Sequence, residues 1–122
     1  MAEALGLDFG TTNTVIAVAE NGDDTRSVSF TSPAGTTDSM RTALSFLKDP
    51  QLGAGALKVE AGQAAIRTFI DNPGDCRFLQ SIKTFAASAL FQGTLVHARR
   101  FQFEDLMEVF LKRLQAYGGE GW

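Results

Sequence analysis

The stretch that decides the fold lies near the start of the chain and reads Leu5-Gly6-Leu7-Asp8-Phe9-Gly10-Thr11-Thr12-Asn13-Thr14, followed at once by Val15-Ile16-Ala17-Val18-Ala19. From Ala4 to Phe9, apolar residues alternate with small or acidic ones, which is the period-2 pattern of a β-strand. Residues 15–19 are continuously apolar and partly β-branched, as in a more buried strand. The connection 10–13 has the length of a hairpin loop, so we predict a β-hairpin.

The tip of this hairpin carries groups that suit a phosphate. It offers consecutive backbone N–H groups, two hydroxyls and no bulky side chain, in the order Gly10, Thr11, Thr12, Asn13. Such donors can converge on an anion without steric interference. Asp8, at the end of the first strand, places a carboxylate beside the tip, where Mg²⁺ or its bound water would sit. The alternative is an ordinary tight turn, for which Gly, Thr and Asn are equally suitable.

The hairpin differs from the commoner nucleotide-binding loops. The chain contains neither the Gly-x-x-x-x-Gly-Lys-Ser/Thr loop nor the Gly-x-Gly-x-x-Gly dinucleotide fingerprint. A hairpin that binds phosphate in place of a strand-to-helix loop points to the actin-like ATPase superfamily. Residues 8–13, Asp-Phe-Gly-Thr-Thr-Asn, resemble the first phosphate motif of that superfamily.

Composition and charge argue against several classes of function. The 122 residues suffice for one domain or part of one, and 44% hydrophobic with 20% charged residues is ordinary for a globular protein. A net charge of −3 provides no basic field for nucleic acid. The single cysteine, Cys76, excludes an internal disulfide and forms no metal-ligand set with the single histidine, His97. No apolar run approaches a membrane span and no secretory leader opens the chain, so we expect a cytoplasmic location by elimination.

The rest of the chain is predicted to mix strands and helices. Strands are predicted at residues 25–31, 41–47, 57–60 and 94–98, and the polar segment 32–40 is predicted to be an exposed loop. Helices are predicted at residues 63–71, 78–85 and 104–117 from apolar side chains at helical spacing and from their end signals.

Four further segments follow the hairpin in a recognisable order. They are Arg41-Thr42-Ala43-Leu44-Ser45, Gly62-Gln63-Ala64-Ala65 with Asn72-Pro73 after it, Ser81-Ile82-Lys83, and Phe103-Glu104-Asp105-Leu106. Together with the hairpin they resemble the N-terminal part of the ATPase domain of the DnaK-type heat-shock chaperones, the seventy-kilodalton family, over essentially the whole chain. Leu44 stands where that family usually has proline, and Thr84 where it usually has arginine. Residues 85–88 also replace a more basic run, so the resemblance is to a divergent member.

The resemblance implies an α/β fold (α+β in a fragment), as part of an actin-like, ribonuclease H-like ATPase domain. It implies one partial domain over residues 1–122, with the first core strands and the phosphate hairpin in 1–40. A peripheral subdomain would occupy 41–100, and 101–122 would form a helix returning to the core. The family's second phosphate loop, its adenosine motif and its substrate-binding domain would follow Trp122. We therefore expect an N-terminal fragment that is inactive alone.

The same resemblance implies the roles of individual residues. The hairpin residues Gly10, Thr11, Thr12 and Asn13 would bind the phosphates of ATP or ADP, and Asp8 would hold Mg²⁺ through water. Lys83 would lie near the γ-phosphate and the attacking water, so Asp8 and Lys83 are the predicted catalytic residues. The complete protein would hydrolyse ATP to open and close its lobes. A client polypeptide or co-chaperone would contact its remaining part, and neither nucleic acid nor membrane is an expected partner.

Two other functions stay open at this point. A small-molecule, sugar-type kinase of the same superfamily has an almost identical opening hairpin but lacks the lysine-bearing subdomain, and the fold alone does not separate the two. A non-enzymatic interaction module that retains a decayed hairpin is the third possibility.

Overall fold

A computed structural model describes residues 4–20, 24–49, 51, 56–80, 94–97 and 99–119 of the chain. The described part is a mixed α/β structure made mostly of strands, with two helices. The elements, in chain order, are β1 (Ala4–Phe9), β2 (Asn13–Glu20), β3 (Asp24–Ser27), β4 (Phe30–Ser32), β5 (Gly35–Thr37), β6 (Met40–Arg41), β7 (Ala43–Lys48), β8 (Leu57–Ala61), α1 (Gln63–Asp71), β9 (Cys76–Gln80), β10 (Thr94–Val96), β11 (Arg99–Phe101) and α3 (Phe103–Gly118).

The first sheet is built around β2. The predicted hairpin is confirmed, because β1 pairs antiparallel with β2 along its whole length, from Ala4 opposite Ala19 to Phe9 opposite Thr14. β3 pairs with the end of β2 and β6 with its beginning. Along β2 the side chains of Thr14, Ile16 and Val18 are buried, so one face of the strand is turned to the core, as alternation requires.

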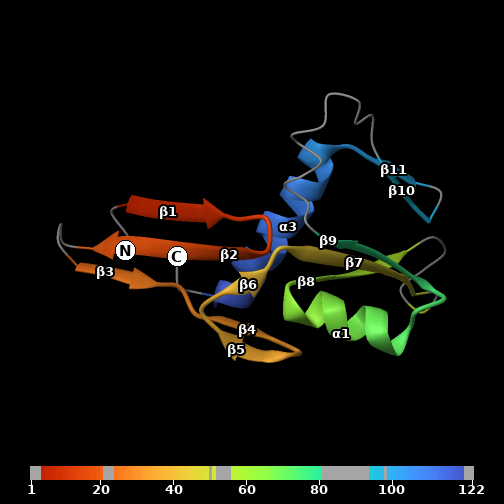
Figure 1. Cartoon of the computed structure of the whole chain (residues 1–122), viewed down its shortest axis with the longest axis horizontal. Coiled ribbons are helices and arrows are strands. Elements are labelled where there is room, and N and C mark those ends of the chain that lie inside the picture. Colours follow the sequence, from red (N-terminus) through yellow and green to blue (C-terminus); the bar gives the residue numbers. More distant parts are fainter. Residues whose placement is uncertain are drawn as a thin grey trace.

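The second sheet is built around β7, which lies between β8 and β9 and is antiparallel to both. Helix α1 packs against all three strands and lies below this sheet in Figure 1. The ring of Phe69 in α1 stacks on Phe78 in β9 with 4.8 Å between the ring centres. The predicted strand 57–60 and helix 63–71 are both confirmed, the helix with the predicted boundaries.

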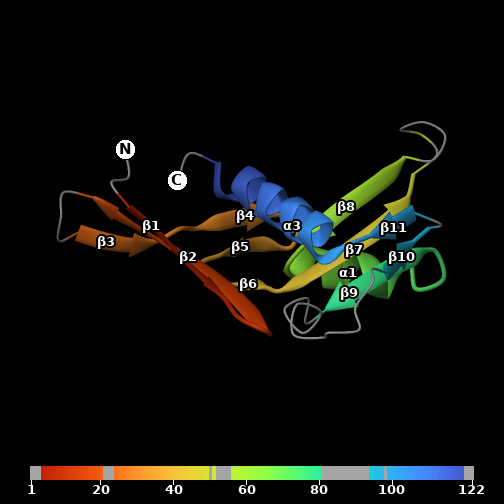
Figure 2. The same cartoon turned by 90° about the horizontal axis from the view of Figure 1, so that it is seen from above.

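Helix α3 completes the core. It contacts β4, β8 and β11, and Figure 2 shows it running between β11 and β4. Its buried side chains are Leu106, Phe110, Leu114 and Tyr117, a spacing of three to four residues that defines one helical face. Phe110 also meets Phe9 at the end of β1, edge to face, with ring centres 5.8 Å apart. The hairpin is therefore fixed to the same core as the second sheet.

The ends of α3 follow from local chemistry. The backbone N–H of Gln102 donates to the Asp105 carboxylate at 2.9 Å, and the side chain of Gln102 caps the first turn in return. Gly119, with φ of 57°, ends the helix in a conformation that favours glycine. The helix thus starts and stops within one residue of the predicted range 104–117.

A buried polar cluster fastens the last turn of α3 to β8. The Tyr117 hydroxyl donates to the Glu60 carboxylate and accepts from the Ala61 N–H at 3.4 Å. The Arg113 guanidinium lies 3.8 Å from the same carboxylate and 4.7 Å from the centre of the Tyr117 ring. Burial, and then the hydrogen bond to Glu60, raise the pKa of the Tyr117 hydroxyl above its ordinary value of 10.0.

Two sequence predictions are wrong between residues 25 and 40. The single strand predicted at 25–31 is two strands in different sheets, because pairing with β2 ends near Val28 and Phe30 turns into the core. The predicted loop 32–40 contains β5 and the start of β6. Gly35, with φ of 118°, allows the tight turn that pairs β4 with β5.

Two further predictions need correction. The strand predicted at 41–47 is interrupted at Thr42, where the chain passes from β6 in the first sheet to β7 in the second. The helix predicted at 78–85 is wrong for its first residues. Residues 76–80 form β9, whose pairing with β7 satisfies the backbone groups that a helix would have satisfied locally. The rest of that prediction lies outside the described residues. The strand predicted at 94–98 is confirmed as β10 but ends at Val96, because His97 lies in a turn, and residue 98 lies outside the described residues.

Candidate functional site

The tip of the β1–β2 hairpin is tight and exposed. The Gly10 N–H donates to the Asn13 carbonyl oxygen at 2.9 Å, so Thr11 and Thr12 form the tip itself. A Cβ atom at position 10 would lie 2.6 Å from that same Asn13 oxygen, so this tight turn requires glycine at position 10. The predicted binding residues are thus brought together, and the side chains of Thr11, Thr12 and Asn13 are exposed.

Thr42 holds the tip from the neighbouring segment. Its N–H donates to the Thr12 carbonyl oxygen at 2.8 Å, and its hydroxyl donates to the Gly10 carbonyl oxygen at 2.9 Å. The Thr42 hydroxyl also lies 2.8 Å from that of Thr14. Both threonines are buried, with 2% of Thr42 and none of Thr14 exposed, so the bond between their hydroxyls lies in the interior, whereas the bond to Gly10 is partly buried. No local sequence pattern predicts this role, because Thr42 stands out only as part of the family resemblance.

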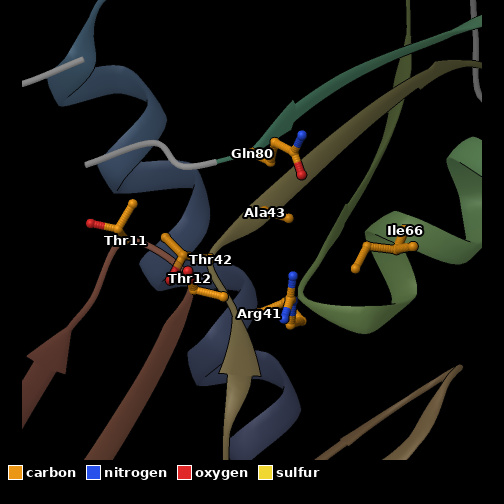
Figure 3. A pocket seen from close by; sticks show the side chains of 7 residues that line it. All are labelled: Thr11, Thr12, Arg41, Thr42, Ala43, Ile66 and Gln80. Atoms are coloured by element: carbon orange, nitrogen blue, oxygen red, sulfur yellow. The ribbon is translucent and has the colours of Figure 1, made fainter. Parts of the chain in front are cut away.

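A small cavity of about 40 Å³ lies beside the tip. Its walls come from the hairpin, the β6–β7 junction, α1 and the end of β9, through Thr11, Thr12, Arg41, Thr42, Ala43, Ile66 and Gln80 (Figure 3). One water molecule needs roughly 10–15 Å³ of cavity volume, so this cavity has room for a few waters and is too small for a nucleotide. Arg41 adds a positively charged side chain to the wall of this cavity.

Asp8 stands apart from this cavity. It is exposed on β1 opposite Val15, and adjacent strand residues face opposite sides, so Asp8 points away from the core that Phe9 enters. Within the described ranges, no three His, Cys, Asp or Glu side chains come close enough to hold a metal ion. One carboxylate still fits the way Mg²⁺ binds beside phosphates, because that ion keeps several waters and needs one or two protein carboxylates.

Lys83, the second predicted catalytic residue, lies outside the described residues. Gln80, at the end of β9, is the nearest described residue before it in the chain and lines the cavity.

Cys76 and His97 lie away from the hairpin. Burial raises the pKa of the Cys76 thiol, and its contacts with the Phe46 backbone and the Ser45 hydroxyl oppose that rise only in part. Because the thiolate is the reactive form, this surrounding disfavours a nucleophile. His97 adopts φ of 48° and its Nε2 atom lies 2.7 Å from the Phe46 carbonyl oxygen, so its ring is held by the sheet.

Comparison with models of protein families and with curated proteins gives no match for this sequence. Among the described residues, neither helix is both long and apolar enough to cross a membrane.

Proposed function

We propose that this chain is the phosphate-binding part of an ATP-binding domain, in a protein that resembles the DnaK-type chaperone ATPases. The observation that carries the proposal is the β1–β2 hairpin, whose tip exposes small and hydroxylic residues and is held by two hydrogen bonds from the buried residue Thr42. Anion binding is favoured when N–H donors are already held in place, since they then need no reorganisation on binding.

In this proposal each residue at or near the tip makes a different contact with the nucleotide or its metal ion. The N–H groups of residues 11–13 and the hydroxyls of Thr11 and Thr12 would donate to the β- and γ-phosphates. The Arg41 guanidinium, on the wall of the adjacent cavity, would add attraction for the phosphate charge. Asp8 would orient the water shell of Mg²⁺, an ion that neutralises phosphate charge when bound. Phosphoryl transfer to water depends mainly on such positioning and charge stabilisation.

The proposed role of Lys83 rests on the family resemblance alone. Lys83 follows Gln80, which lines the cavity beside the tip, by three residues in the sequence, and it lies outside the described residues. A positive charge beside the γ-phosphate would stabilise the negative charge that develops on the transferred phosphoryl group.

Nuclear magnetic resonance of the isotopically labelled chain tests this proposal. On addition of MgATP, we expect the amide signals of residues 10–13 to shift in a saturable manner, with a dissociation constant near 1 mM, which corresponds to about −4 kcal/mol. The β4–β5 hairpin is an internal control, because it too has a glycine and threonines at an exposed turn. Shifts of equal size at both hairpins, or none at residues 10–13, would refute the proposal.

A further inference from the structure

We propose that Thr42 is a positioning residue that sets the orientation of the hairpin tip for anion binding. The inference rests on the proposed function, since it concerns how the same tip is made ready for phosphate. It concerns a residue on a different segment, at the junction of β6 and β7.

The carbonyl groups of the tip bear directly on anion binding. A carbonyl oxygen carries partial negative charge and repels a phosphate, whereas an N–H group attracts it. Two of the tip carbonyls, those of Gly10 and Thr12, accept hydrogen bonds from Thr42 at 2.9 and 2.8 Å. These two oxygens therefore point toward Thr42. Because the C=O and N–H of one trans peptide point in opposite directions, the N–H groups of Thr11 and Asn13 point away from Thr42.

The hydrogen bonds of Thr42 have a fixed direction. A threonine hydroxyl carries one proton, and Thr42 gives its proton to the Gly10 oxygen. The bond of 2.8 Å between the two buried hydroxyls must then run from Thr14 to Thr42. Thr14 belongs to β2, so a chain of donors leads from the first sheet through Thr42 to the tip. Loss of the Thr42 hydroxyl would leave the buried Thr14 hydroxyl and the partly buried Gly10 carbonyl without this partner, so the tip would be held less firmly.

Three variants of the full chain test this inference. Thr42→Val keeps the shape and removes the hydroxyl, whereas Thr42→Ser keeps the hydroxyl. Thr36→Val is the matched control, because it breaks the hydrogen bond of 3.1 Å between the Thr31 and Thr36 hydroxyls in the exposed β4–β5 hairpin. The probe is inorganic tripolyphosphate, followed through the amide signals of residues 10–13. We expect Thr42→Val to weaken binding at least tenfold, and Thr42→Ser and Thr36→Val to stay within about twofold of the unaltered chain.

The amide spectrum without ligand gives a second readout. Thr42→Val should shift the signals of residues 10–13, and Thr42→Ser should leave them nearly unchanged. If Thr42→Val does not fold, the scalar coupling across the hydrogen bond from the Thr42 N–H to the Thr12 carbonyl in the unaltered chain decides the matter, and its absence overturns the inference.

The inference is also overturned if a folded Thr42→Val chain retains the tip spectrum, or if Thr42→Ser loses as much affinity as Thr42→Val. Failure of the unaltered chain to bind tripolyphosphate would instead count against the proposed function. In that case the ligand-free amide spectra of the variants would still test whether Thr42 orients the tip.

Discussion

Replacement of Gly10 by alanine should disturb the candidate site through a single added methyl group. The new Cβ would lie 2.6 Å from the Asn13 carbonyl oxygen, which is backbone and has no side-chain freedom with which to move away. Ordinary contacts of a Cβ atom begin near 3.4 Å, so the two sides of the tip must separate. The required opening of about 0.8 Å is enough to break the hydrogen bond from Gly10 to Asn13.

The cost can be estimated from its parts. The overpacking caused by the added methyl group destabilises the fold by about 1–3 kcal/mol. The lost hydrogen bond costs about 1 kcal/mol more. Alanine restricts the unfolded chain and returns about 0.4–1 kcal/mol. The net loss of unfolding free energy is then about 2 kcal/mol, which lowers the melting temperature of a chain of this size by about 8 °C.

Gly74 provides the matched control for this experiment. A Cβ there meets no atom within 4 Å, so Gly74→Ala should be neutral or slightly stabilising. Thermal unfolding followed by circular dichroism compares the two variants, and the amide signals of residues 11–13 report on the tip. Equal melting temperatures for the two variants would refute the geometry described for the hairpin.

Three further predictions address the α3 cluster and the proposed activity. The raised pKa of Tyr117 means that the folded chain holds its proton more tightly than the unfolded chain, so this group's contribution to stability is complete below pH 10.0 and is lost as the pH rises through the folded pKa. Since Tyr117 is the only tyrosine, the ultraviolet absorbance of tyrosinate follows it directly, and titration at or below its ordinary pKa would contradict the buried contact with Glu60. In the complete ATPase that we propose, Asp8→Asn should cut turnover on the order of a hundredfold with the fold intact, whereas unchanged turnover would show that Asp8 is an ordinary exposed residue of the hairpin. Lys83→Ala in the same protein should keep ATP affinity within a few fold while hydrolysis falls by roughly two orders of magnitude, and normal hydrolysis would favour a sugar-type kinase over the chaperone-type ATPase.

Local patterns were sufficient where an element is stabilised by its own sequence. The alternation from Ala4 to Phe9 and the short connection after it predicted the β1–β2 hairpin, because the two strands are neighbours in the chain. Helix α1 was predictable for a similar reason. Its apolar residues recur at helical spacing, and Asn72 with Pro73 ends it, which local sequence specifies without reference to distant partners.

Local patterns were insufficient where distant pairing decides the structure. Residues 76–80 have Phe78 and Leu79 side by side, a pattern compatible with a helix or a strand, and they become β9 because β7 lies beside them. β4 and β5 have three residues each, and of these residues only Phe30 is fully buried. Such short strands carry too few apolar positions to show a period.

The candidate site combines both situations. The residues of the tip are consecutive and were recognised from the sequence, but their orientation depends on Thr42, which is 32 residues from Gly10 and 28 from Thr14. A threonine between Arg41 and Ala43 has no local feature that distinguishes it from other polar residues at strand ends. Its hydrogen bonds arise because the chain crosses there from the first sheet to the second. The geometry of the tip is therefore a property of both sheets together, and it follows from neither segment alone.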